Sequence, residues 1–208
     1  MNADANPIVL SSASGYVVLQ RGDDPLPQDA GQVLLPLARA AIAGELGITR
    51  PARDDLPWLQ RHGACFITVT QGDDLRGCIG TLRPHRTLAE DVRANAVAAA
   101  FRDPRFKPLA VEEFGGIALE ISVLSALESL RCAGEQDALK QLRPGVDGVI
   151  FEYGHHTSTF LPQVWEKMPE PGDFLAQLKL KAGLPPDFWD RDVKLARYTV
   201  AKWREAGS

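Results

Sequence analysis

The stretch Gly63–Leu82 reads GACFITVTQGDDLRGCIGTL and is the part of the sequence that decides the fold. Residues 63–70 form a run rich in β-forming side chains, and residues 75–82 run back as a second such segment. Between them, Gln71-Gly-Asp-Asp74 is a polar segment typical of a turn. The sequence therefore predicts two adjacent antiparallel strands joined by a tight turn.

A third strand is predicted at residues 117–124, where apolar and other residues alternate with period two. Its apolar face consists of Ile117, Leu119, Ile121 and Val123. Glu120 lies opposite that face. The sequence leaves two interpretations open for Glu120, a solvated side chain or a buried acid that faces a site.

Single helices are predicted between the strands. Thr87-Leu-Ala-Glu90 is a capping-box sequence that opens a helix extending to about Phe101. Three other helices are expected, from Asp29 as a cap, at residues 135–142, and from about Asp173 to Ala182. A hairpin is expected at 148–153 and 158–161, and a strand-like segment with a phase slip near Ala196 at 193–203. Strands that arrive mostly as hairpins favour an α+β fold with a largely antiparallel sheet flanked by helices.

Length and composition indicate an ordinary globular chain. The 208 residues are 45% hydrophobic and 24% charged, which is enough apolar material for one domain with a core of its own. We expect an irregular N-terminal lead-in over residues 1–27 and a single domain over 28–208, with a smaller sublobe around 83–115. The net charge of −4 argues against non-specific binding to nucleic acid.

Cysteine usage indicates a reducing compartment. The three cysteines cannot all pair within one chain, and the N-terminus has neither a basic region nor a long apolar segment of a secretory signal. No apolar run approaches the length of a membrane span. We therefore expect a cytoplasmic protein without membrane attachment. Without CxxC or HExxH spacing, no metal site is expected.

Cys78 is the strongest candidate for chemistry. On a strand, Arg76 and Cys78 point the same way, and a guanidinium beside a thiol favours the nucleophilic thiolate form. Gly77 and Gly80 remove side chains near the sulfur, so that a ligand or another backbone can approach. The alternative is that Cys78 is a small core residue and the glycines mark a bulge.

Two further segments carry charged groups near a predicted helix end. In the loop before Thr87, Arg83 and Arg86 could converge with free backbone N–H groups on an anion, or the loop could simply be exposed. After that helix, Asp103 and Arg105 could bracket a ligand, or pair structurally at the helix exit. No histidine lies two residues from Cys78 on the same strand, so the sequence leaves open whether His62 or His85 serves it as a base.

These segments, taken in order, resemble the AmmeMemoRadiSam system protein A family, which is the AMMECR-type domain. The resemblance extends over about residues 28–203. It rests on LRGCIGTL, NAVAAAFRDPRF, IALEISVLS, GVIFEY with TFLPQVW, and FLAQLKLKAGLP, which occur here in the order of the family.

The resemblance implies an α+β domain with two sublobes and a cleft between them. It implies that Arg76, Gly77, Cys78 and Gly80 belong to the family signature, and that Asp103 and Arg105 belong to a second characteristic segment. It also implies a Memo-type protein and a radical-SAM protein as partners. The reaction and the cofactor stay unknown. An enzyme or pathway subunit that uses Cys78 on a small molecule or nucleobase is one hypothesis, and a non-catalytic protein-binding module or scaffold is the other.

Overall fold

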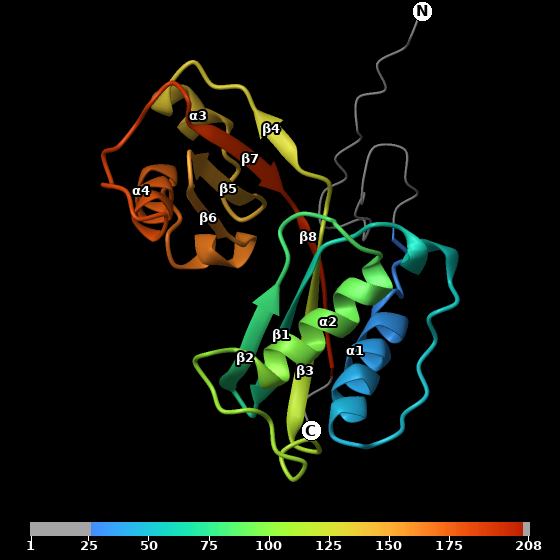
Figure 1. Cartoon of the computed structure of the whole chain (residues 1–208). Coiled ribbons are helices and arrows are strands. Elements are labelled where there is room, and N and C mark those ends of the chain that lie inside the picture. Colours follow the sequence, from blue (N-terminus) through green and yellow to red (C-terminus); the bar gives the residue numbers. More distant parts are fainter. Residues whose placement is uncertain (1–25, 206–208) are drawn as a thin grey trace, which may run out of the picture. The chain divides into compact units, whose positions relative to one another are not determined.

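The computed structural model describes residues 26–205, which form two compact units (Figure 1). Unit 1 contains residues up to Leu124 together with those from Ala201 onward, and unit 2 spans Ser125–Val200. The expected lead-in at 1–27 lies outside the described residues except at its last two positions. The sequence predicts a smaller sublobe around 83–115, but these residues lie within unit 1. The second unit is formed by residues 125–200 instead.

Unit 1 is built on a four-stranded sheet in the order β2-β1-β3-β8. Both neighbours of β1 run antiparallel to it, which confirms the predicted hairpin and an α+β class. A bulge between Val69 and Thr70 interrupts the pairing of β1 with β2. The strands are β1 (Cys65–Gln71), β2 (Asp74–Gly80), β3 (Ile117–Leu124) and β8 (Val200–Arg204).

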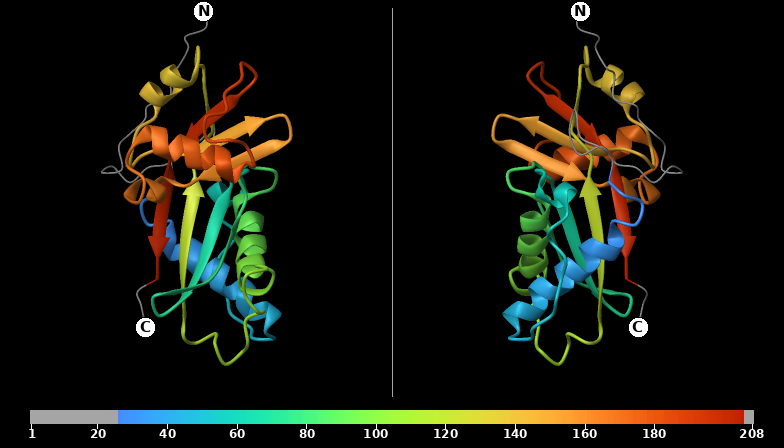
Figure 2. Two further views of the ribbon diagram at one scale, coloured as in Figure 1. Left: turned by 90° about the vertical axis from the view of Figure 1, so that its left-hand side faces the viewer. Right: turned by 90° about the vertical axis from the view of Figure 1, so that its right-hand side faces the viewer.

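Two helices, α1 (Gly31–Glu45) and α2 (Leu88–Phe101), lie on one side of this sheet (Figure 2). The predicted capping box at the start of α2 is confirmed, since Thr87 and Glu90 each accept a hydrogen bond from the other's backbone N–H. The start of α1 differs from the expectation, because Ala30 occupies the cap position and offers no side-chain hydrogen bond. A short 3-10 helix, η2 (Pro57–Gln60), precedes β1.

The period of two along the strands gives the sheet of unit 1 two different faces. Ile67 on β1 and Leu119 on β3 are fully buried in a core that α1 and α2 share. Alternate residues therefore point away from the helices. On that second face Thr68 and Glu120 are only partly buried, and this is the face that carries the candidate site.

Unit 2 has its own antiparallel sheet, in the order β4-β7-β5-β6. Its helices pack around a core in which the rings of Trp165 and Phe174 stack with centroids 3.7 Å apart. Gly183, with φ +79°, follows the last helix of this unit and ends it. The elements are β4 (Glu128–Leu130), α3 (Glu135–Gln141), β5 (Gly148–Tyr153), β6 (His156–Phe160), η3 (Pro162–Glu166), α4 (Pro171–Lys181) and β7 (Lys194–Tyr198).

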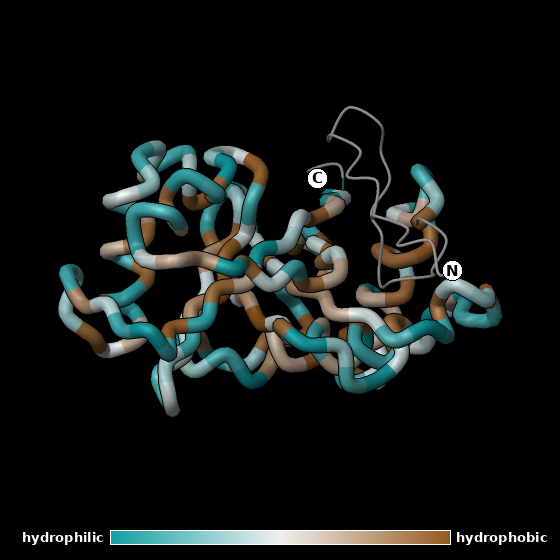
Figure 3. Tube along the Cα trace, turned by 90° about the horizontal axis from the view of Figure 1, so that it is seen from above, coloured by the Kyte–Doolittle hydropathy of each residue, from teal (hydrophilic) through white to brown (hydrophobic). Residues whose placement is uncertain are grey.

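Hydrophobic residues are spread in short stretches through both units (Figure 3). They alternate with hydrophilic stretches, which is the pattern of amphipathic strands and helices around two cores. Over residues 26–205, no helix combines the length and the apolar character needed to cross a bilayer.

Candidate functional site

A row of polar side chains crosses the second face of the unit 1 sheet. Cys78 of β2 is directly opposite Thr68 of β1, and Thr68 is directly opposite Glu120 of β3. Directly opposite residues in antiparallel strands share a face, with Cβ atoms about 5 Å apart. On β8, Lys202 completes the row, because its Nζ atom lies 3.1 Å from Oε1 of Glu120. A thiol, a hydroxyl, a carboxylate and an ammonium group therefore follow one another across four strands.

The sulfur of Cys78 has a hydrogen-bond donor beside it. Thr68 Oγ1 lies 3.3 Å from Cys78 Sγ and donates to it. Cys78 is neither fully buried nor fully exposed, so the sulfur is held by a neighbour but not sealed in the core. Within residues 26–205, no histidine nitrogen lies within hydrogen-bond distance of this sulfur.

Asp103 and Arg105 hold the peptide groups of Cys78. The N–H of Cys78 donates to Asp103 Oδ2 at 2.9 Å, and its carbonyl accepts from the Arg105 guanidinium at 3.3 Å. β2 is an edge strand, so no further strand pairs with its outer peptide groups. Asp103 and Arg105 bind the outward N–H and C=O of Cys78 instead, and in this way they cover the edge. The structure pairs Asp103 with Arg105 at 2.6 Å, which was one of the two alternatives open in the sequence, and ligand binding by them stays a prediction.

Arg76 has partners on the segment that connects α2 to β3. Its guanidinium donates to both carboxylate oxygens of Glu113, at 2.9 and 3.1 Å. It also donates to the backbone carbonyls of Lys107 and Pro108. Arg76 therefore joins β2 to that segment, and the pKa of Glu113 is held below its usual range chiefly by this guanidinium.

The two glycines of the LRGCIG segment meet different neighbours. Gly77 is buried against α2, where a Cβ would overlap the carbonyl oxygen of Ala99. The sequence allows either a ligand or another backbone to lie close to Gly77, and the structure places the backbone of α2 there. Gly80 lies beneath the ring of Phe66, which is directly opposite on β1. Its missing side chain makes room for that ring on the face that carries Cys78.

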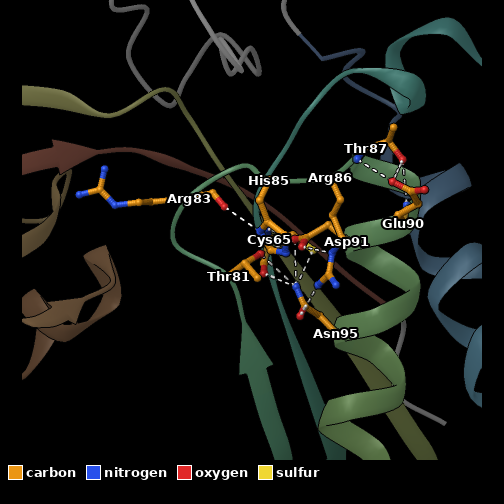
Figure 4. Close-up of polar contacts among 9 residues, drawn as sticks. All are labelled: Cys65, Thr81, Arg83, His85, Arg86, Thr87, Glu90, Asp91 and Asn95. Carbon is orange, nitrogen blue, oxygen red and sulfur yellow. Dashed lines mark hydrogen bonds and ion pairs between the residues drawn. The ribbon is translucent and has the colours of Figure 1, made fainter.

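A buried polar network lies at the start of β1 (Figure 4). Asp91, which is fully buried, accepts hydrogen bonds from the Cys65 N–H at 2.8 Å, from Thr81 Oγ1 at 2.6 Å and from Asn95 at 2.9 Å. Its second oxygen accepts from Arg86 Nε at 2.8 Å. The network ties the first residue of β1 to α2 and to the loop between β2 and α2.

Of the two alternatives for the loop before Thr87, this network argues against the anion site. The Arg86 guanidinium is bound to Asp91 and Asn95, so it does not face an incoming anion. Glu90 places a carboxylate at the helix start, where its pKa is lowered chiefly by the Thr87 backbone N–H. A negative side chain already occupies the position that an anionic ligand would need.

The three cysteines have different surroundings. Cys65 is buried, and its thiol pKa is raised well above its usual value by that burial and by the nearby Asp91 carboxylate. Cys132 in unit 2 is partly buried, which also raises its pKa. Neither environment favours a thiolate. All three sulfurs have a hydrogen-bond donor, and the contact is shortest at Cys78, 3.3 Å from Thr68 Oγ1, against 3.6 Å from Gln141 Nε2 to Cys132 and 3.7 Å from Asn95 Nδ2 to the buried Cys65.

The pairing of Asp103 predicts a pH dependence of stability. Hydrogen bonds from Arg105 first, and then from the Cys78 N–H, hold the pKa of Asp103 well below its usual value. The folded state then binds fewer protons, so this stabilisation is present above about pH 4, the unfolded value, and is lost as the pH falls below it.

We expect Asp103→Asn to be less stable than the wild type at pH 7 by roughly 1–2 kcal/mol. The difference should shrink between about pH 4 and pH 2, as urea unfolding at several pH values would show. Asp73→Asn, in the exposed turn between β1 and β2, is the matched control. A difference that stays constant down to pH 2 would contradict this assignment.

Two cavities lie elsewhere on the described chain. One of about 610 Å³ in unit 1 is lined by Val33, Pro36 and Arg53 among others, and one of about 400 Å³ in unit 2 by Glu152, Asp192 and Lys194 among others. Neither is lined by Cys78, and the cleft that the family resemblance implies stays a prediction. Among residues 26–205, no group of three or more Cys, His, Asp or Glu side chains is arranged to hold a metal ion.

Known proteins are similar in sequence to this chain over most of its length. A protein of Methanothermobacter thermautotrophicus is 38% identical over 189 residues, covering 88% of this chain and 98% of that protein. A protein of Methanocaldococcus jannaschii is 36% identical over 186 residues, covering 86% of this chain and 92% of its own length.

A solved structure has the same fold. The crystal structure of an uncharacterized protein from Pyrococcus horikoshii superposes with a TM-score of 0.78 at 33% identity, covering 86% of this chain and 93% of that one. The family model described as AMMECR1 matches residues 35–203, which include Cys78 and the segment with Asp103 and Arg105. The expected resemblance is confirmed, and the chain belongs to the AMMECR1 family.

Proposed function

We propose that this chain uses the Cys78 thiol as a nucleophile on a small molecule or nucleobase. The observation that carries the proposal is the hydrogen bond of 3.3 Å from Thr68 Oγ1 to Cys78 Sγ. A hydroxyl donor stabilises a thiolate more than a thiol, since hydrogen bonds to charged acceptors are the stronger ones. Asp103 and Arg105 are positioning residues in this proposal, because they hold the backbone of Cys78 rather than its sulfur.

The hydrogen bond that the Cys78 N–H already makes to Asp103 limits how this site could stabilise an oxyanion. In many acyl-transfer enzymes a backbone N–H beside the nucleophile stabilises the developing oxyanion. Here the N–H of Cys78 itself is directed to Asp103. A substrate carbonyl at Cys78 would need a different donor, and the Thr68 hydroxyl is the group of the row next to the sulfur that could turn its proton from Sγ to that oxygen.

The setting of this activity is also part of the proposal. The family resemblance suggests that the chain works with a Memo-type protein and a radical-SAM protein, in the cytoplasm, where free thiols stay reduced. Co-expression of the tagged chain with each partner tests the association. We expect a complex that persists through size-exclusion chromatography, and separate elution of all three proteins would remove the partners from the proposal.

The reactivity of the three thiols tests the proposed nucleophile. With iodoacetamide at pH 7, Cys78 should be alkylated at least tenfold faster than Cys132, while Cys65 should stay protected in the folded protein. Digestion and mass spectrometry at timed intervals give the three rates. Equal rates at Cys78 and Cys132 would contradict the proposal.

Thr68 provides a matched pair of variants for the same measurement. We expect Thr68→Val, which keeps the shape and loses the hydroxyl, to slow the alkylation of Cys78 at pH 7 by about tenfold. Thr68→Ser, which keeps the hydroxyl, should restore most of the rate. Arg76→Ala should have the smaller effect, because its guanidinium is engaged with Glu113. A larger effect of Arg76→Ala would transfer the role to that residue.

A binding module is the second candidate function, and one observation favours it. Arg76, Asp103 and Arg105 all make contacts within the chain, as they would if the LRGCIG segment were structural. In that case Cys78 should react no faster than an ordinary exposed thiol, and Thr68→Val should leave its rate unchanged.

A further inference from the structure

The charged side chains beside Cys78 are joined in pairs of opposite charge. Arg76, two residues earlier on β2, lies 2.9 Å from Glu113. Arg105, which donates to the Cys78 carbonyl, lies 2.6 Å from Asp103. Across the row, Lys202 lies 3.1 Å from Glu120. Each of these three cations, the two next to Cys78 and Lys202 at the far end of the row, therefore has its own carboxylate.

Paired charges change what the site can attract. The field of an ion pair falls off faster with distance than that of a single charge, so three pairs leave little net potential at the sulfur. An anionic substrate would have to separate a cation from its carboxylate, and that loss would offset much of its own attraction.

The degree of engagement differs among the three cations. All three nitrogens of the Arg76 guanidinium donate, to Glu113 and to two backbone carbonyls. Arg105 meets both oxygens of Asp103. Lys202 has one carboxylate contact and a side chain that is 39% exposed. Removing the partner carboxylate would therefore free Lys202 more completely than Arg76 or Arg105, which also donate to backbone carbonyls.

We infer that the substrate attacked by Cys78 is an uncharged polar small molecule, and not a phosphorylated or carboxylated one. The row supplies it with a hydroxyl at Thr68 and with a carboxylate and an ammonium that still have hydrogen-bonding capacity. This inference rests on the proposed function, since it names the substrate class of the same site.

Two alkylating probes of similar size test the inference. Iodoacetamide is neutral and iodoacetate is anionic, and both transfer a substituted methyl group to sulfur with loss of iodide. At 0.15 M salt, the ratio of their rates at Cys78 should lie within about threefold of the ratio for a capped, uncharged cysteine peptide. A preference of tenfold or more for iodoacetate, relative to that peptide, would overturn the inference.

A charge variant makes the test sharper. Glu120→Gln removes the carboxylate from Lys202, which lies three strands from Cys78, so the iodoacetate rate at Cys78 should rise about twofold in 0.01 M salt, where screening extends over about 30 Å, while the iodoacetamide rate stays the same. Glu112→Gln, at an exposed position of the segment between α2 and β3, makes the same change in net charge and should have little effect. Equal effects of the two variants would overturn the inference.

The two proposals fail in different ways. If Cys78 reacts with neither probe faster than Cys132 does, the proposed nucleophile is wrong. If Cys78 is the fastest thiol but prefers the anionic probe, the nucleophile stands and the substrate class is wrong. Circular dichroism of each variant shows that the fold is retained before the rates are compared.

Discussion

Asp91→Ala is expected to lower the free energy of unfolding by about 3–5 kcal/mol. Asp91 is fully buried and is the common acceptor for a backbone N–H, a hydroxyl, an amide and a guanidinium. Its removal leaves these donors without their acceptor, including the charge of Arg86. Stranded buried donors are costly because they have lost water without gaining a partner.

Chemical denaturation in urea measures this effect. Since small domains are stable by only about 5–15 kcal/mol, the variant should unfold at a much lower urea concentration. Asp91→Asn keeps the volume and part of the hydrogen bonding, so its loss should be smaller. Asp73→Ala, in the exposed turn after β1, should change stability by less than about 0.5 kcal/mol. A loss below about 1 kcal/mol for Asp91→Ala would show that the network contributes little.

Local patterns were sufficient to predict much of unit 1. The alternation at residues 117–124 matches β3 at both ends, and the capping box gave the correct start of α2. These signals are local, since period two and a capping sequence report on neighbouring residues only. The hairpin was also correct, although Gln71 and Asp74 extend the strands into the expected turn. Gly72 adopts the positive φ of +59° that so tight a turn needs.

Local sequence patterns do not show which sheet a strand joins. Residues 193–203 were expected as one strand-like segment with a phase slip near Ala196. The structure has two strands, β7 and β8, which join different sheets and are separated at Thr199. Both have strand composition, and the partner of each is chosen by packing with residues distant in sequence. The phase slip does correspond to a break between two strands, but the break lies at Thr199, three residues after Ala196.

The same distinction explains the candidate site. Cys78 and the segment with Asp103 and Arg105 were visible in the sequence, because polar residues, glycines and a helix end cluster there. Thr68 was missed, because counting back through the turn pairs it with Gly77, and only the bulge between Val69 and Thr70 shifts the register so that Thr68 lies across from Cys78. Lys202 could not be found in this way, because its place beside Glu120 depends on β8 joining this sheet.

Gly77→Ala should have the second large effect, a loss of about 3 kcal/mol in the free energy of unfolding. A Cβ at this position would overlap the backbone carbonyl oxygen of Ala99 on α2. Backbone atoms of a helix cannot rotate out of the way as a flexible side chain can. The strand and the helix would therefore have to separate, which loosens the packing of the core between them.

Gly115→Ala is the matched control, because a Cβ there meets no atom within 4 Å and its backbone is not in the left-handed region. Its stability should change by no more than about 0.5 kcal/mol in the same urea titration. The two substitutions add the same methyl group, so the difference between them isolates the contact with α2.

That contact also fixes the strand on which Cys78 lies. If Gly77→Ala folds but is destabilised, its Cys78 should be alkylated more slowly than in Gly115→Ala, since Thr68 would no longer be held opposite the sulfur. Unchanged stability in Gly77→Ala would mean that β2 and α2 are not packed as closely as the structure places them.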